Sequence, residues 1–388
     1  MAKLSDIFDL QMGKTPARAN SDYWNNGTNS WVSIADLSSY EKYVGETKEK
    51  ITDIAIHESG IKAVPPNTVI MSFKLSLGKT AIAKNAVYAN EAIMAFIPNG
   101  CYNISPDYFF YMLSGRDWSK GTNRAVMGAT LNKATLGEIN VTVPPIEEQR
   151  YVAAVLDKLT GLISLRKQQL AKLDELVKAR FVEMFGDMLL NPLSWSEKPL
   201  ENMADIVSGI TKGRKTQSTE FIEVPYMAVS NVKDGYIDWT TVKMIMATQS
   251  EINQYRILPD DVLMTEGGDP DKLGRGAIIR EPMENCIHQN HIFRVRLNRK
   301  TILPEFFAEY LQHQKSKRYF LRCAKQTTGI ASINMKQLRA LPVLLPPIGI
   351  QEMFADFVAG VEQQKLTIQQ SLDKLEVLRK SLMQEYFG

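Results

Sequence analysis

The segment from Val143 to Gly186, VPPIEEQRYVAAVLDKLTGLISLRKQQLAKLDELVKARFVEMFG, occurs twice in this chain. It aligns without gaps to the segment from Leu345 to Gly388, LPPIGIQEMFADFVAGVEQQKLTIQQSLDKLEVLRKSLMQEYFG, with 14 identities in 44 columns. Each copy opens with Pro-Pro-Ile, and proline fits the start of a helix because an N–H there would have no intrahelical partner. Each copy then runs without proline to a final Phe-Gly. The repeat predicts two long helices of common origin.

Apolar residues recur at heptad spacing in both segments. In the first copy they are Leu156, Leu159, Ile163, Leu170, Leu173, Val177 and Met184, interrupted by Arg166 and Arg180. In the second copy they are Val358, Val361, Ile368, Leu372, Leu375, Leu382 and Tyr386, interrupted by Lys365 and Arg379. A helix of about 38 residues is roughly 57 Å long and cannot bury such a stripe alone, so the other copy is its most available partner. The alternative is that each helix lies only on its own domain.

The rest of the chain repeats as well. The segment MADIVSGITKGRKT at Met203–Thr216 echoes LSDIFDLQMGKTPAR at the N-terminus, and Ile257–Ile279 echoes the strand, Gly- and Lys-bearing loop and strand of Val64–Ala83. The order is therefore unit, helix, unit, helix, with globular units at 1–142 and 187–344 and helices at 143–186 and 345–388. Short strands mixed with short helices predict an α+β (mixed α/β) fold for each unit.

The composition of the 388 residues is that of a globular protein of more than one domain, with 44% hydrophobic and 23% charged residues. No apolar run is long enough for a transmembrane helix, and no signal peptide is evident, so we expect a cytoplasmic protein. Three widely spaced cysteines, Cys101, Cys286 and Cys323, favour a reducing compartment.

Charge is nearly balanced overall but not locally. The net charge is +3 and the pI about 8.5. Between Gln312 and Arg339, however, there are seven basic residues and no Asp or Glu. A stretch of one sign in a balanced chain indicates a surface for a polyanion.

The sequence offers no catalytic site. LSLGKT at 75–80 ends like a phosphate-binding loop, but Phe73 stands where its first glycine belongs. Neither a Gly-x-Gly-x-x-Gly fingerprint nor an Asn/Asp-Pro-Pro-aromatic motif is present. His288 and His291 lie three residues apart on one predicted strand and point to opposite faces, so neither catalysis nor metal binding is predicted. Asp260 and Asp261 follow Pro259, where a turn accounts for them.

Binding residues are the remaining candidates. Polar side chains, most of them hydrogen-bond donors, recur beside Gly-containing loops at matching places in both units, where they could contact phosphates or base edges while glycine permits close approach. In the first unit they are Lys14, Lys74, Lys79, Asn123, Arg124 and Lys133. In the second unit they are Lys212, Arg214, Asp269, Lys272, Arg275, Lys325, Gln326, Thr327, Thr328, Asn334 and Lys336. Any one of them could equally be a solvated surface residue, and the recurrence favours a shared task.

Three features together carry a family resemblance. They are the Leu/Val-Pro-Pro-Ile-x-x-Gln start of each long segment, the Thr-Gly-Ile-Ala-Ser-Ile-Asn-Met-Lys-Gln-Leu run at Thr328–Leu338, and the Pro-x-x-Val-Leu-Met turn at Pro259–Met264. With the duplication, they resemble the DNA specificity (S) subunits of type I restriction-modification systems over essentially the whole chain. In the first copy, the segment from Gly121 to Leu136 matches the Thr-Gly pattern of the family less closely.

The resemblance implies two target recognition domains and an antiparallel coiled coil of the two helices as their spacer. Such a subunit performs no catalysis and reads a bipartite double-stranded DNA target, one half-site per domain. It docks two modification subunits, which use S-adenosylmethionine, and through them restriction subunits, which use ATP and Mg. Two modules that read major-groove faces one turn apart must be held about 34 Å apart, which a rigid helix pair can do.

Two other function classes remain open from the sequence. One is a single-chain methyltransferase with a fused recognition domain, against which the missing catalytic motifs argue. The other is a coiled-coil scaffold whose basic loops bind only proteins. Salt-dependent binding to DNA separates that scaffold from a specificity subunit.

Overall fold

In a computed structural model, the chain divides into two compact units. The first unit comprises residues 1–167 and 370–388, and the second comprises residues 168–369. The structure describes residues 1–74, 76–118, 124–125, 128–129, 131–213, 220–269, 273–327 and 330–388. Neither long helix, nor any other helix in these ranges, offers the long apolar stretch that crossing a bilayer requires.

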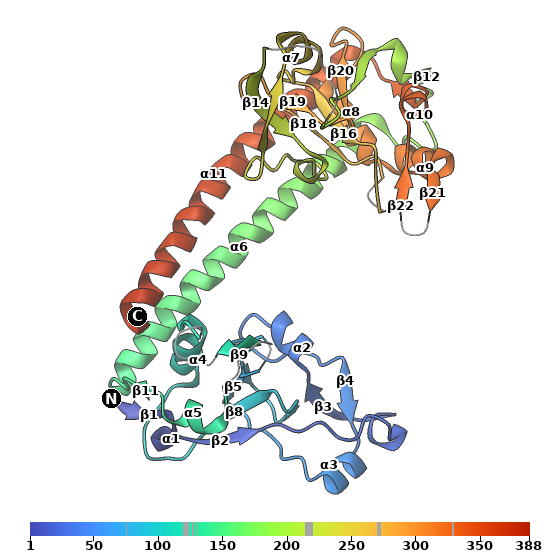
Figure 1. Cartoon of the computed structure of the whole chain (residues 1–388). Coiled ribbons are helices and arrows are strands. Elements are labelled where there is room, and N and C mark those ends of the chain that lie inside the picture. Colours follow the sequence, from blue (N-terminus) through green and yellow to red (C-terminus); the bar gives the residue numbers. More distant parts are fainter. Residues whose placement is uncertain are drawn as a thin grey trace. The chain divides into compact units, whose positions relative to one another are not determined.

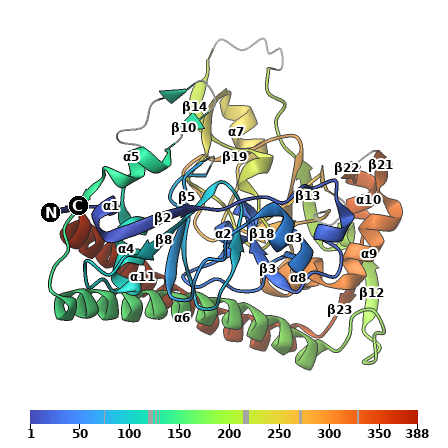
Figure 2. The ribbon, with the colours of Figure 1, turned by 90° about the horizontal axis from the view of Figure 1, so that it is seen from below.

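The first unit is built on a four-stranded antiparallel sheet with the order β2-β8-β5-β6. Three of its strands, β2, β8 and β5, are labelled in Figure 2. A three-stranded sheet, β4-β3-β7, and a two-stranded ladder, β1-β11, accompany it, and β9 pairs with β10. The strands are β1 (Ala2–Lys3), β2 (Phe8–Met12), β3 (Asn29–Val32), β4 (Glu49–Ile51), β5 (Thr68–Ser72), β6 (Thr80–Ala83), β7 (Tyr88–Ala89), β8 (Ile93–Pro98), β9 (Arg124–Ala125), β10 (Gly128–Ala129) and β11 (Asn140–Val141). The short helices are α1 (Leu4–Ile7), α2 (Ile34–Ser39), α3 (Asp53–Ser59), α4 (Pro106–Gly115) and α5 (Lys133–Gly137).

The second unit repeats these sheets in the same order, as β13-β20-β16-β18, β15-β14-β19 and β12-β23. The strands are β12 (Ser196–Pro199), β13 (Ala204–Ser208), β14 (Ile222–Met227), β15 (Lys243–Ala247), β16 (Val262–Thr265), β17 (Gly267–Gly268), β18 (Gly276–Ile278), β19 (Ile287–His288), β20 (Ile292–Leu297), β21 (Lys325–Thr327), β22 (Ile330–Ser332) and β23 (Pro342–Leu345). The helices are α7 (Gln249–Tyr255), α8 (Pro304–Gln312), α9 (Gln314–Cys323) and α10 (Met335–Arg339). The predicted duplication and α+β class are therefore confirmed.

The long helices are α6 (Ile146–Phe185) and α11 (Ile348–Phe387), each of 40 residues (Figure 1). In the first unit, the end of α11 packs near the start of α6, where Tyr386 joins the cluster that contains Leu156. In the second unit, the end of α6 meets the start of α11, and the ring centroids of Phe185 and Phe354 are 5.4 Å apart. Both contacts require antiparallel helices, as predicted.

Ion pairs join the two long helices in each unit, and one of them involves Lys365, which interrupts the apolar stripe. Lys365 on α11 lies 2.8 Å from Asp174 on α6 and 3.0 Å from Glu362. In the first unit, Lys167 on α6 lies 3.0 Å from Glu376 on α11. Surface pairs of this kind contribute little free energy, and their placement across the two helices favours one register.

A buried glutamine fixes the start of each long helix. The Gln149 amide donates to Asn103 O at 3.0 Å and to Pro144 O at 2.8 Å, and its oxygen accepts from Ser105 N at 2.8 Å. In the second copy, Gln351 makes the equivalent bonds to Thr301 O, Pro346 O and Leu303 N. The glutamine of the Pro-Pro-Ile-x-x-Gln motif thus fastens each helix to the globular part of its unit.

One prediction about a strand is wrong. The sequence predicts that His288 and His291 share one strand, but β19 ends at His288 and β20 begins at Ile292. The break arises because the two strands serve different sheets: β19 pairs in parallel with β14, and β20 pairs antiparallel with β13 and β16. A turn closed by Ile292 N and Gln289 O, 2.9 Å apart, joins them.

Candidate nucleic-acid interface

The predicted binding loops of the two units adopt equivalent positions. In the first unit, the turn between β5 and β6 lies beside the segment that leads into α5, because Leu131 N donates to Phe73 O at 3.1 Å. In the second unit, the turn between β16 and β18 lies beside the segment that leads into α10, because Ile333 N donates to Glu266 O at 2.9 Å. Each unit thereby joins two loops that are distant in sequence.

A glycine and an aromatic ring brace each loop. Gly78 has φ +79°, and a Cβ built on it would lie 2.4 Å from the Trp118 ring. Gly274 has φ +73°, and its Cβ would lie 2.4 Å from the Phe320 ring. Both the left-handed backbone and the ring exclude a larger residue. This explains why a glycine recurs at this place in both copies.

An asparagine caps the helix that follows each loop. Asn132 Oδ1 accepts from Thr135 N at 2.8 Å at the start of α5. Asn334 Oδ1 accepts from Gln337 N at 3.0 Å at the start of α10. The cap satisfies a backbone N–H that the helix leaves free. Asn334 was predicted as a DNA contact, but its side-chain oxygen Oδ1 already caps α10.

Several predicted contacts are exposed cations beside these loops. Lys79 and Lys133 lie there in the first unit, and Lys325 and Lys336 in the second. None of the four forms an ion pair with a described residue. Exposed ammonium groups can bind the phosphates of a nucleic acid.

The other predicted residues lie in varied surroundings. Lys14 is exposed and donates to Ser59 O, while Lys74 places its ammonium 5.2 Å from the Phe73 ring centroid. Lys212 and Asp269 are exposed. Arg275 precedes β18, and its half-buried side chain has a buried Nε without a partner among the described residues. Arg124 lies in β9, and Gln326 and Thr327 lie in β21. Asn123, Arg214, Lys272 and Thr328 fall outside the described residues.

The structure sorts the basic stretch between Gln312 and Arg339 into two groups. Lys315 pairs with Glu197 at 2.6 Å, and Lys317 lies 3.8 Å from Asp234. The remaining bases form no ion pair with a described residue. Two of them, Arg318 and Arg322, are exposed one turn apart on α9, whose Phe320 is buried.

Arg318 and Arg322 were not selected as contacts from the sequence. Their i, i+4 spacing and the absence of nearby acids were the available signal. What the sequence did not show is that α9 leads directly into β21, so that this basic helix adjoins Lys325.

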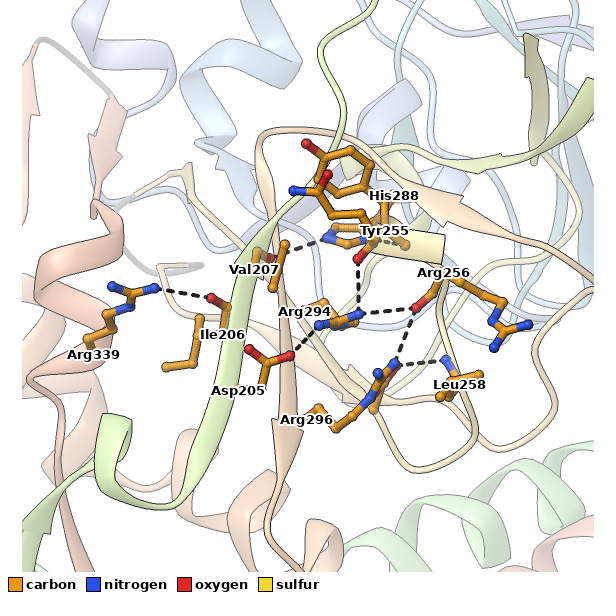
Figure 3. Close-up of polar contacts among 12 residues, drawn as sticks. Asp205, Ile206, Val207, Tyr255, Arg256, Leu258, His288, Arg294, Arg296 and Arg339 are labelled. Carbon is orange, nitrogen blue, oxygen red and sulfur yellow. Dashed lines mark hydrogen bonds and ion pairs between the residues drawn. The ribbon is translucent and has the colours of Figure 1, made fainter. Parts of the chain in front are cut away.

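The buried polar residues of the second unit form a structural network rather than a site (Figure 3). His288 Nδ1 lies 2.9 Å from Tyr255 O and Nε2 lies 3.3 Å from Val207 O. Burial lowers the pKa of His288 to about 4. Arg294 lies 2.5 Å from Asp205, and both Arg294 and Arg296 donate to Arg256 O. These groups tie β13 and β20 to the segment after α7.

Asp260 and Asp261 have more than a turn role. The Asp261 carboxylate accepts from Leu258 N at 2.7 Å, as expected in a turn, and it also pairs with Arg296 at 2.8 Å. Asp260 has φ +68° and pairs with Arg280 at 3.0 Å. Among the described residues, no group of three His, Cys, Asp or Glu side chains is arranged to hold a metal ion.

Comparison with known proteins agrees with this duplicated architecture. The family of the type I restriction modification DNA specificity domain matches residues 1–175 and 192–377. The specificity subunit of the type I restriction enzyme MjaIX from Methanocaldococcus jannaschii is 22% identical over 400 residues, covering 98% of this chain and 90% of that protein. The EcoKI specificity subunit from Escherichia coli K12 is 24% identical over 251 residues, covering 61% of this chain and 53% of that protein.

Solved structures share the fold. The S subunit of a type I restriction-modification system from M. genitalium superposes with a TM-score of 0.55 at 15% identity, covering 100% of this chain and 95% of that one. A chain from a study of complex assembly and conformational transition of the type I R-M system superposes with a TM-score of 0.60 at 15% identity, covering 100% and 96%. The family match spans both units and most of each long helix, and this chain therefore belongs to the type I restriction modification DNA specificity family.

Proposed function

We propose that this chain is the DNA recognition subunit of a type I restriction-modification complex and that it reads a bipartite double-stranded target. Residues 1–142 and 187–344 are the two target recognition domains, one for each half-site. The paired helices set the gap between half-sites. The observation that carries this proposal is the repeated pair of loops, in which Leu131 and Phe73 in one unit match Ile333 and Glu266 in the other.

The chemistry of these loops suits a nucleic acid. Exposed lysines can bind phosphates without regard to sequence, and the side chains of the loops can read base edges in the major groove. Because the two copies carry different residues on the same backbone frame, each copy can read a different sequence. The exposed arginines of α9, Arg318 and Arg322, extend the cationic surface of the second unit.

The long helices offer surfaces for partner subunits. Tyr151, Leu165 and Val377 are 65%, 56% and 70% exposed in the first unit, and Met353 and Leu366 are 61% and 53% exposed in the second. These apolar side chains lie outside the apolar stripe of the two helices and are accessible to a protein partner. We assign them to docking of two modification subunits, with restriction subunits joining through these.

Catalysis belongs to those partners in this proposal. S-adenosylmethionine, ATP and Mg act in the modification and restriction subunits, and this chain contributes recognition in the cytoplasm. The DNA-binding residues proposed for it are the seventeen predicted above, together with Arg318 and Arg322.

Binding-site selection with the assembled complex tests the division of labour. Replacing Lys325, Gln326, Thr327 and Thr328 with Ala should abolish the preference at one half-site and leave the other unchanged. The matched variant in the first unit, Lys79→Ala with Lys133→Ala, should weaken the binding of DNA through that first unit. If the first variant altered both half-sites equally, the proposal of one reader per half-site would be wrong.

A further inference from the structure

The second unit contains a cavity at the place that the side chain of Lys42 occupies in the first unit. It has a volume of about 730 Å³ and lies among α6, α8, α11, β18 and the loop at 234–239. This volume is within the range of small-molecule sites. Its lining contains six carboxylates and three cationic side chains: Asp174, Asp234, Glu281, Glu305, Glu309 and Glu362 with Lys178, Arg280 and Lys365.

In the first unit, a lysine of the chain itself occupies the equivalent place. The Lys42 ammonium lies 2.7 Å from Asp107 on α4 and pairs with Asp157 on α6. Tyr111 donates to Asp157 at 2.6 Å, and its ring centroid is 5.1 Å from the ammonium. The Lys42 side chain is only 13% exposed. The first copy therefore shows that this junction binds an alkylammonium group between carboxylates and aromatic rings.

The second copy keeps an acid but loses the groups that fill the space. Aligning Pro106 with Pro304 places Glu305 at the position of Asp107, Ala308 at that of Phe110 and Glu309 at that of Tyr111. Two rings are thus replaced by a methyl group and a carboxylate. In the first unit, Lys42 lies in the loop beside β6. The corresponding loop of the second unit lies beside β18 and contributes Tyr236 and Trp239 to the cavity lining.

The acids in the cavity are incompletely paired. One oxygen of Glu305 lies 2.8 Å from Arg280, but Oε2 is buried and has no hydrogen-bond partner among the described residues. The Glu305 side chain is 9% exposed. Glu309 forms no ion pair with a described residue, and burial raises its pKa. A buried acceptor without a donor is costly, and a bound cation would supply the missing donors.

We propose that this cavity binds an aliphatic diamine or polyamine, with one ammonium group between the carboxylates of Glu305 and Glu309. Asp174, Asp234 and Glu362 are paired with Lys365 or Lys317. Glu281 and Glu309 form no ion pair with a described residue, and this favours a ligand with more than one ammonium. Trp239 and Tyr236 provide aromatic surface against which an alkyl chain and its ammonium groups can lie. The cavity is open on one side, and its volume can accommodate a small aliphatic amine.

Titration calorimetry on the purified full-length chain, free of DNA, tests the site with putrescine and spermidine. We expect one binding site, tighter for spermidine than for putrescine, and none for 1,4-butanediol, which lacks charge. Glu305→Gln and Glu309→Gln should each weaken binding by about tenfold or more, since each removes a charged hydrogen-bond acceptor. Glu309→Tyr, which restores the residue of the first copy, should abolish binding.

Glu175→Gln is the matched control, because Glu175 is exposed on α6 next to Asp174 but does not line the cavity. Its affinity should equal that of the wild type. Thermal unfolding of each variant reports whether it is folded. The site would be refuted by failure of both amines to bind the folded wild-type chain, or by affinity that the Glu305 and Glu309 variants leave unchanged.

Discussion

The Gln149 side-chain amide donates a hydrogen bond to the Pro144 carbonyl oxygen, 2.8 Å away. Gln149 is fully buried, and its oxygen also accepts from the backbone N–H of Ser105 at 2.8 Å. One side chain thus joins the turn before α6 to the turn before α4. The same arrangement at Gln351 in the second copy makes it a feature of the repeat.

Gln149→Ala should lower the free energy of unfolding by about 2 kcal/mol, because it leaves a buried N–H and two carbonyl groups without their partner. Urea unfolding followed by circular dichroism measures the change. Gln168→Ala, at an exposed position within α6, is the control and should change stability little. Equal effects of the two substitutions would show that the buried hydrogen bonds do not stabilise the junction.

The exposed lysines Lys325 and Lys336 of the second unit predict a change in the salt dependence of DNA binding. Replacing Lys325 and Lys336 with Ala should lower the slope of log affinity against log salt concentration by about 2, since each phosphate contact contributes about 0.9. Fluorescence anisotropy with the assembled complex and a labelled duplex measures the slope. Lys300→Ala, an exposed lysine in the turn before α8, should leave it unchanged. An unaltered slope in the double variant would remove these residues from the phosphate contacts.

Burial of His288 predicts a loss of stability in acid. Its pKa is lowered from 6.5 to about 4, so the unfolded chain binds a proton that the folded chain does not. The stability that neutral His288 contributes is therefore fully present above about pH 6.5. It is lost as the pH falls toward 4, by roughly 3 kcal/mol in total. Between about pH 7.5 and about pH 5, the wild type should lose about 2 kcal/mol more than His288→Gln in urea unfolding.

His57→Gln is the control for this measurement, because His57 is exposed on α3. It should lose as much stability in acid as the wild type. If His288→Gln also kept the full loss, the acid sensitivity would come from other groups.

The repeat made the fold predictable, and tertiary context limited the prediction of the site. Two copies of the Pro-Pro-Ile-x-x-Gln motif identified both long helices, although the task of the glutamine, which bonds to residues up to 50 positions away, was not visible in the pattern. The alignment of Gly78 with Gly274 could not show that rings at Trp118 and Phe320 would brace both loops. Spacing reveals local periodicity, whereas these contacts depend on how distant segments fold together.

Side-chain engagement was equally hidden in the sequence. Asn334 reads as a donor in a polar loop, yet its oxygen caps α10. Lys315 and Lys325 look alike within one basic stretch, but Lys315 pairs with Glu197, more than a hundred residues earlier, whereas Lys325 pairs with no acid in the described part of the chain. Which cations stay free is decided by such distant partners.

The long helices predict how the recognised target responds to their length. Inserting one helical turn of four residues after Gln169, with the same insertion after Ser371 in α11, should lengthen each helix by about 6 Å. At about 3.4 Å per base pair along the duplex, the gap between half-sites should grow by one or two base pairs. Both half-sites should be kept, because the loops at Phe73 and Glu266 lie outside the helices. Sequencing of methylated sites in cells that carry the variant with its partner subunits measures the gap directly.

Four residues inserted after Gly100, an open turn with φ +85°, provide the control and should leave the gap unchanged. An unchanged gap in the helix variant would mean that the helices do not set the spacing.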